Sequence, residues 1–183
     1  MTSTDNQSAT PSAQGSPFWR FSLRLYRAPG VGDACIALQE TSGVDVNLLL
    51  FLLWQATERH ALTAADVKAL DETIGGWRDT AVIPLRNLRR ALKSSPGLVA
   101  PNAAEAFRTR IKAVELEAER LQQEAMYALA ATMPLGRTLG RDAASPVEAA
   151  RSNVAAYETM RVVAFPKAAV DTVLTAFAKL EGE

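Results

Sequence analysis

Apolar residues recur every three or four positions along most of this chain, which is the spacing that places them on one face of an α-helix. No segment sustains the alternation of apolar and polar residues that marks a half-buried strand. The segments expected to be helical are residues 17–27, 31–40, 45–59, a stretch from 64, 77–93, 102–133, a stretch from 145, and 166–180. The pattern therefore predicts an all-α fold, a compact bundle of about six to eight helices.

Several of these segments carry residues that commonly start or stop a helix. Capping residues followed by a first-turn proline or an acidic partner stand at Ser16-Pro17, Thr63-Asp66 and Ser145-Pro146. Gly43 lies where a left-handed C-cap is expected. Pro84 interrupts the segment 77–93 and predicts a kink or the first turn of a new helix there.

The longest predicted helix carries an apolar seam. Its members alternate spacings of four and three residues and are Phe107, Ile111, Val114, Ala118, Leu121, Ala125 and Ala128. Such a seam is typical of a helix that packs lengthwise on a partner. The most apolar run of the chain, residues 48–54, is much shorter than the roughly 18 residues of a membrane span, so it predicts a buried core helix.

Length and composition change this picture only slightly. The 183 residues, 48% of them hydrophobic, suit one domain better than two. Residues 1–16 are polar and predict a disordered N-terminal tail, which leaves 17–183 as a single helical domain. The tail lacks the apolar core of a signal peptide, and the single cysteine, Cys35, cannot form an intrachain disulfide. Both observations predict a cytoplasmic protein.

Two groups of residues resemble a known family. The first is Phe18-Trp19-Arg20-Phe21-Ser22-Leu23, Tyr26, Pro29-Gly30-Val31, Ala34-Cys35, Leu38-Gln39 and Asp45-Val46-Asn47-Leu48-Leu49-Leu50-Phe51 with Trp54. The second is Trp77, Pro84-Leu85-Arg86, Arg89-Arg90, Lys93, Ile111-Lys112, Glu115-Leu116 and Ala118-Glu119-Arg120. Over residues 17–133 the chain resembles an uncharacterised proteobacterial family of conserved hypothetical proteins, a domain of unknown function. Residues 134–183 lie outside the resemblance as a C-terminal helical extension, and the resemblance implies no activity, catalytic residue or cofactor.

A basic stripe is the most distinctive candidate site. Arg86, Arg89, Arg90 and Lys93 stand at i, i+3, i+4 and i+7, so one helix face gathers them. Several guanidinium groups together suit phosphate oxygens, which predicts an anion site. The alternatives are an ordinary solvated face, or internal ion pairs with Glu115 and Glu119, which stand one turn apart on the longest helix.

Familiar catalytic and metal sites find little support in the sequence. His60 is the only histidine and Cys35 the only cysteine, so the standard zinc and di-iron ligand sets are missing. The two residues could form a nucleophile and base, but the apolar neighbours of Cys35 favour a buried structural thiol. No phosphate-binding glycine motif is present. We therefore predict no catalytic residue, metal ligand or cofactor.

Two functions from different classes fit these features. The first is a non-enzymatic accessory or adaptor protein that binds another macromolecule, with a protein as the expected partner, through helical faces. The second is an enzyme or carrier for an amphipathic anionic small molecule, bound in an apolar pocket with arginines at its mouth. Candidate binding residues are Arg86, Arg89, Arg90, Lys93, Trp54 and Trp77. Nucleic-acid binding through the basic stripe ranks third, because the 20 basic and 20 acidic side chains cancel.

Overall fold

The computed structural model describes residues 15–94, 97–133, 135–140 and 144–182. Its helices are α1 (Pro17–Tyr26), α2 (Val31–Ser42), α3 (Val46–Thr57), α4 (Ala64–Trp77), α5 (Ile83–Ala91), α6 (Pro101–Ala130), α7 (Pro146–Arg161) and α8 (Lys167–Glu181). A π-helical turn, η1 (Arg78–Val82), joins α4 to α5, and a 3-10 turn, η2 (Leu92–Ser94), follows α5. The predicted all-α fold is confirmed, whereas the predicted disordered tail lies outside the described residues except for Gly15 and Ser16.

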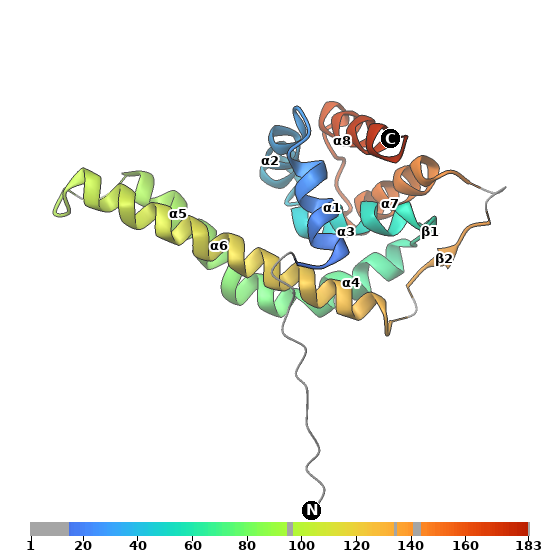
Figure 1. Ribbon diagram of the computed structural model, residues 1–183, viewed down its shortest axis with the longest axis horizontal. Helices are drawn as coiled ribbons and strands as arrows, with labels where there is room; N and C mark the ends of the chain where they lie inside the picture. Colours follow the sequence, from blue (N-terminus) through green and yellow to red (C-terminus); the bar gives the residue numbers. More distant parts are fainter. Residues whose placement is uncertain (1–14, 95–96, 134, 141–143, 183) are drawn as a thin grey trace, which may run out of the picture.

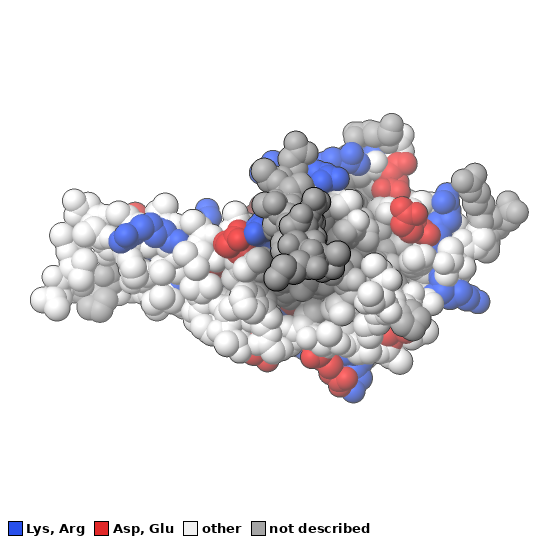
Figure 2. All heavy atoms as spheres, turned by 60° about the horizontal axis from the view of Figure 1, so that its bottom comes forward, with Lys and Arg blue, Asp and Glu red and all other residues white. Residues whose placement is uncertain are grey.

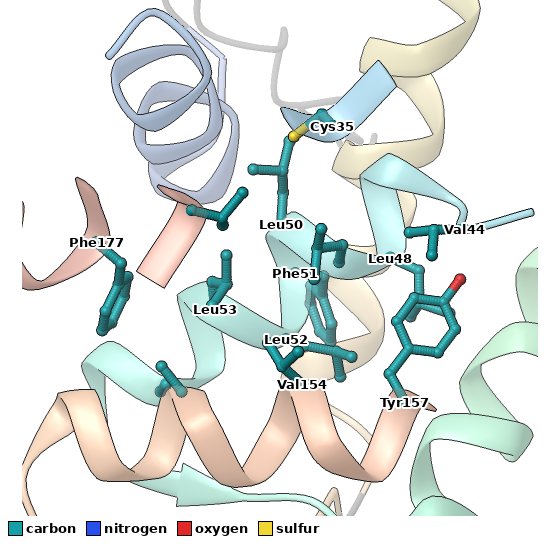
Figure 3. Close-up of a cluster of buried hydrophobic side chains, with 14 of the residues drawn as sticks. Cys35, Val44, Leu48, Leu50, Phe51, Leu52, Leu53, Val154, Tyr157 and Phe177 are labelled. Carbon is teal, nitrogen blue, oxygen red and sulfur yellow. The ribbon is translucent and has the colours of Figure 1, made fainter. Parts of the chain in front are cut away.

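The core forms around α3, which other helices cover on all sides. Leu48 to Leu53 are each at most 3% exposed, because α1, α2, α6 and α7 all pack on this one helix. Figure 3 shows Leu50, Leu52 and Leu53 pointing in different directions from the same helix, toward residues of its neighbours. Val154 and Tyr157 of α7 and Phe177 of α8 belong to the same core, so the C-terminal helices share it with the N-terminal ones.

The capping signals place the helix ends as predicted. Ser16, Thr63 and Ser145 cap α1, α4 and α7, the last two through complete capping boxes, and Gly43 ends α2 in the left-handed conformation. Pro84 lies in the first turn of α5, but α4, η1 and α5 are continuous, so its missing N–H removes one hydrogen bond from this helical run. The π-helical turn before it lets α4 run on into α5 without a loop.

The structure corrects the expectation that the chain has no strands. The residue pairs β1 (His60–Ala61) and β2 (Arg137–Thr138) form a short antiparallel ladder, and both lie outside the segments expected to be helical. The Leu139 N–H extends the ladder by donating to the Arg59 carbonyl oxygen at 2.9 Å. Strands of two residues are too short to show the alternation by which a sequence predicts them.

The predicted apolar seam of α6 is wrong in its orientation. Ala118 is buried, but Phe107, Val114 and Leu121 are 41%, 51% and 43% exposed. The face of α6 that is buried carries Ala104, Glu115, Ala118, Gln122, Gln123 and Met126. Polar side chains hold much of this interface, so the helix is rotated away from the orientation that its apolar residues predict.

Helix α5 and the first half of α6 project from the rest of the molecule, and we call this part the arm. Figure 1 shows the two helices lying side by side and extending to the left of the helices that surround α3. No residue of α5 is buried. None of the described helices is both long enough and apolar enough to cross a membrane.

Asn153 ties α7 to the end of α3 and to β1. Its side chain is fully buried; Nδ2 donates to the carbonyl oxygens of Leu52 and His60, and Oδ1 accepts from the Leu62 N–H, at 2.8 to 3.0 Å. Two of these bonds satisfy backbone groups beside the short ladder, the His60 carbonyl oxygen and the Leu62 N–H. Buried backbone groups without such partners are costly.

We expect Asn153→Ala to lower the free energy of unfolding by about 2 to 5 kcal/mol, since each unpaired buried group costs about 1 to 3 kcal/mol. Urea unfolding measures the change. Asn87→Ala, at an exposed position of α5, is the matched control and should change stability by less than about 0.5 kcal/mol. Equal stability of the two variants would show that the Asn153 bonds contribute nothing.

Candidate functional site

A cleft of about 450 Å³ separates the arm from α1, α2 and α3. The lining residues are Trp19, Ser22, Leu23 and Tyr26 of α1, Cys35, Ile36, Gln39 and Glu40 of α2, Val46, Asn47 and Leu50 of α3, Arg86, Arg89 and Arg90 of α5, Lys93 of η2, and Lys112, Glu115, Leu116, Glu119 and Gln123 of α6. On α1, α5 and α6 these residues recur at intervals of three and four, so each helix turns one face to the cleft. The volume falls within the range of small-molecule sites.

Two of the predicted arginines are held by carboxylates of α6. Arg86 reaches Glu115 at 3.3 Å and Glu119 at 2.8 Å, and Arg89 donates two hydrogen bonds to Glu115. The Glu115 side chain is only 6% exposed, so both arginines offset the cost of burying its charge. The hydrogen bond to Glu115 raises the pKa of Arg89, and burial raises the pKa of Glu119, against the opposing effect of Arg86.

The other cations of the cleft are more exposed. Arg90 pairs at 3.2 Å with Glu40, and both side chains are about half exposed. Lys93 and Lys112 are exposed and, among the described residues, form no ion pair. The cleft is therefore lined by five cations and three carboxylates, and two of the cations have no carboxylate partner there.

A chain of side-chain amides runs from the start of α3 to the cleft. The Asp45 carboxylate caps α3 by accepting the N–H groups of Asn47 and Leu48, and it also accepts from Gln122 Nε2 at 3.0 Å. Gln122 Oε1 then accepts from Asn47 Nδ2 at 3.3 Å, and Asn47 Oδ1 accepts from Gln123 Nε2 at 2.8 Å. Because a carboxylate only accepts, Asp45 fixes the direction of every bond in the chain.

The chain ends on an atom that has no partner. With its nitrogen given to Asn47, Gln123 keeps its Oε1 buried and without a hydrogen bond, in the wall of the cleft. Ser22, also a lining residue and 2% exposed, has a buried Oγ without a partner. Buried polar atoms are almost always paired, so two unpaired ones in one cleft need an explanation.

The structure brings only part of the predicted site together. Arg86, Arg89, Arg90 and Lys93 all line the cleft. Trp54 instead packs against Phe18, Phe51 and Tyr127, and the indole of Trp77, 45% exposed, donates to the Ala118 carbonyl oxygen. Neither tryptophan lines the cleft.

Several site residues were missed by the sequence reasoning. Gln122 and Gln123 play no part in the sequence analysis, and Trp19 and Asn47 appear there only among the residues that carry the family resemblance. Helical spacing could have identified the polar residues of α6, because Glu115, Gln122 and Gln123 fall on the same helical face as Ala104 and Ala118. A search restricted to apolar positions passes over such a face.

Cys35 and His60 do not form the pair considered from sequence. The Cys35 thiol is buried beside the cleft, and burial raises its pKa to about 12, so it stays protonated at neutral pH. The His60 ring lies 2.8 Å from Gln55 Oε1 through Nδ1. Within the part of the chain that the structure describes, no group of three or more histidine, cysteine or acidic residues is arranged to hold a metal ion.

The two arginine environments predict different effects on stability. Arg89→Gln should lower the free energy of unfolding by about 1 to 3 kcal/mol, because Glu115 then stays buried with one guanidinium fewer. Arg90→Gln is the matched control. It removes the exposed ion pair with Glu40 and should change the free energy of unfolding by less than about 1 kcal/mol. Denaturant unfolding of both variants checks this, and a larger loss for Arg90→Gln would contradict the assignment.

Comparison with known proteins adds a family but no activity. No curated protein and no solved structure matches the chain. Residues 17–126 match a family described as a protein of unknown function, DUF2390. This segment contains α1 to α5 and most of α6, hence every residue that lines the cleft. The chain belongs to the DUF2390 family of proteins of unknown function.

Proposed function

We propose that this protein binds a small amphipathic anion in the cleft between the arm and α1 to α3. The observation that carries the proposal is the meeting, in one space of about 450 Å³, of an apolar wall, unneutralised cations and buried polar atoms without partners. Trp19, Leu50 and Leu116 supply apolar surface. Sites of this kind hold a ligand by apolar contact and orient it by a few polar groups.

The positive charge of the cleft supports an anionic ligand. Arg86 and Arg89 are positioned by Glu115 and Glu119, so they stay in place without a ligand. Lys93 and Lys112 have no such partner and leave the cleft with an excess of positive charge. A phosphate or carboxylate at these lysines would gain charge-assisted hydrogen bonds while the internal ion pairs persist.

The proposal concerns binding without a chemical step. The raised pKa of the Cys35 thiol keeps it from acting as a nucleophile at neutral pH. Burial, followed by the nearby Cys35 and Glu119, raises the pKa of Tyr26, which therefore stays a neutral phenol. The carboxylate oxygens of Glu115 are already engaged by Arg86 and Arg89.

The second candidate is an accessory protein that works through a helical face. It is favoured by the apolar side chains that α6 leaves exposed on the arm, since contiguous exposed apolar surface often marks an interaction site. Nucleic acid ranks below both candidates, because acidic and basic side chains balance over the whole chain. The cytoplasmic location stays a prediction.

Binding of hexyl phosphate, measured by titration calorimetry and by chemical shifts of the cleft residues, tests the proposal. Octanoate gives a second anionic probe, and hexylammonium is the control of similar shape and opposite charge. We expect both anions to bind and the ammonium ion not to bind. Binding of all three with equal affinity, or of none, would show that the cleft does not select anions.

The double variant Lys93→Gln/Lys112→Gln should weaken binding of hexyl phosphate about tenfold, or about 1.4 kcal/mol, and leave the unfolding midpoint unchanged. The matched control is Lys167→Gln, because this lysine of α8 is also exposed and does not line the cleft. An unchanged dissociation constant in the double variant would place the anion elsewhere.

Replacement of Ser22 tests whether its hydroxyl group has a structural role or is left free for a ligand. Since Ser22 Oγ is buried without a partner, Ser22→Ala should raise the free energy of unfolding by about 1 kcal/mol. Ser152→Ala, at an exposed position of α7, is the control and should change it little. A clear loss of stability in Ser22→Ala, measured by urea unfolding, would show that the hydroxyl already has a structural role.

A further inference from the structure

Helix α6 leaves an apolar stripe uncovered, which runs from the arm into the second half of the helix. Phe107, Val114 and Leu121 are 41%, 51% and 43% exposed and stand seven residues apart, so they lie in a line along one face. The exposed Trp77 and Leu88 add apolar surface from the helices that adjoin α6. On the face drawn in Figure 2, most of the arm likewise belongs to uncharged residues.

We propose that this stripe is covered by a second copy of the chain, with the two α6 helices antiparallel and a two-fold axis at Val114. The axis follows from the spacing, because Phe107 and Leu121 lie at equal distances on either side of Val114. Val114 then faces Val114 of the partner subunit, and Phe107 faces Leu121 of the partner subunit. A two-fold interface must be self-complementary in this way.

Charge supports the antiparallel direction. Beside the stripe, the first half of α6 carries the basic Arg110 and the second half carries the acidic Glu117. Lys112, Glu115 and Glu119 face the cleft and take no part in this contact. Antiparallel pairing places Arg110 of each helix on the side of Glu117 of the other. A parallel pair would instead place like charges together, which is unfavourable.

One flanking pair matches the same axis. Arg110 stands four residues before Val114 and Glu117 three residues after it, so Arg110 comes beside Glu117 of the partner subunit. Both side chains lie next to the stripe: Arg110 packs over the Phe107 ring at 5.5 Å, and Glu117 accepts from Arg120. Both side chains are exposed, so they can turn toward the partner subunit.

The proposed dimer leaves the cleft free. Lys112 and Glu119 line the cleft, and each stands two residues before a member of the stripe. Two residues correspond to about 200° around an α-helix, so stripe and cleft occupy opposite sides of α6. Loss of the dimer and loss of anion binding can therefore be measured separately.

Sedimentation and light scattering of the full chain test the proposal. We expect twice the chain mass at micromolar concentration, and the mass of one chain for Val114→Glu. Ala113→Glu introduces the same charge on an exposed neighbour outside the stripe and should stay dimeric. A monomeric native chain, or a dimer that survives Val114→Glu, would overturn the proposal.

Charge reversal and cross-linking test direction and register. Arg110→Glu and Glu117→Arg should each weaken the dimer, and the double variant should restore it. Since Cys35 is buried, Val114→Cys introduces one accessible thiol and should form an intersubunit disulfide at the axis. Phe107→Cys should not, because the two copies of residue 107 are about 21 Å apart in this arrangement, too far for a disulfide. Equal cross-linking of both variants, or a double variant no stronger than the singles, would overturn the antiparallel register.

Discussion

The burial of α3 on every side is the constraint on which the rest of the fold depends. A helix without a polar face cannot lie at a surface, so α1, α2, α6 and α7 must all contact it. Tyr157 and Phe177 come from α7 and α8, which lie beyond the segment that matches the family. The family segment of this chain therefore shares its core with helices that follow it.

The start of α3 links this core to the cleft. Asp45 caps the helix and also accepts from Gln122 and Arg78, so its carboxylate joins α3, α6 and the turn after α4. Since this carboxylate sets the direction of the amide chain, it also determines that an acceptor atom of Gln123 ends the chain at the cleft wall. A structural requirement of the core thus fixes part of the chemistry of the candidate site.

The sequence predicted what local residues determine. Capping at Ser16, Thr63 and Ser145 depends on neighbours within one turn, and the basic stripe on α5 follows from helical spacing alone. The orientation of α6 could not be predicted in this way. Apolar periodicity favours a buried Val114, whereas the ion pairs of Glu115 and the bonds of Gln122 turn the helix the other way. Such partners become visible only when distant segments are brought together.

The ion pairs of the arm also decide which cations can meet a ligand. No residue of α5 is buried, so α5 stays on α6 largely through Arg86, Arg89 and the partly buried Leu85. An anion that drew Arg86 or Arg89 away would leave Glu115 buried without its partners, a cost that the ligand would have to offset. An anion at Lys93 and Lys112 meets no such cost. The carboxylate of Glu115, which holds the arm in place, is therefore the reason that the proposed site for an anion lies at the lysines and not at Arg86 and Arg89.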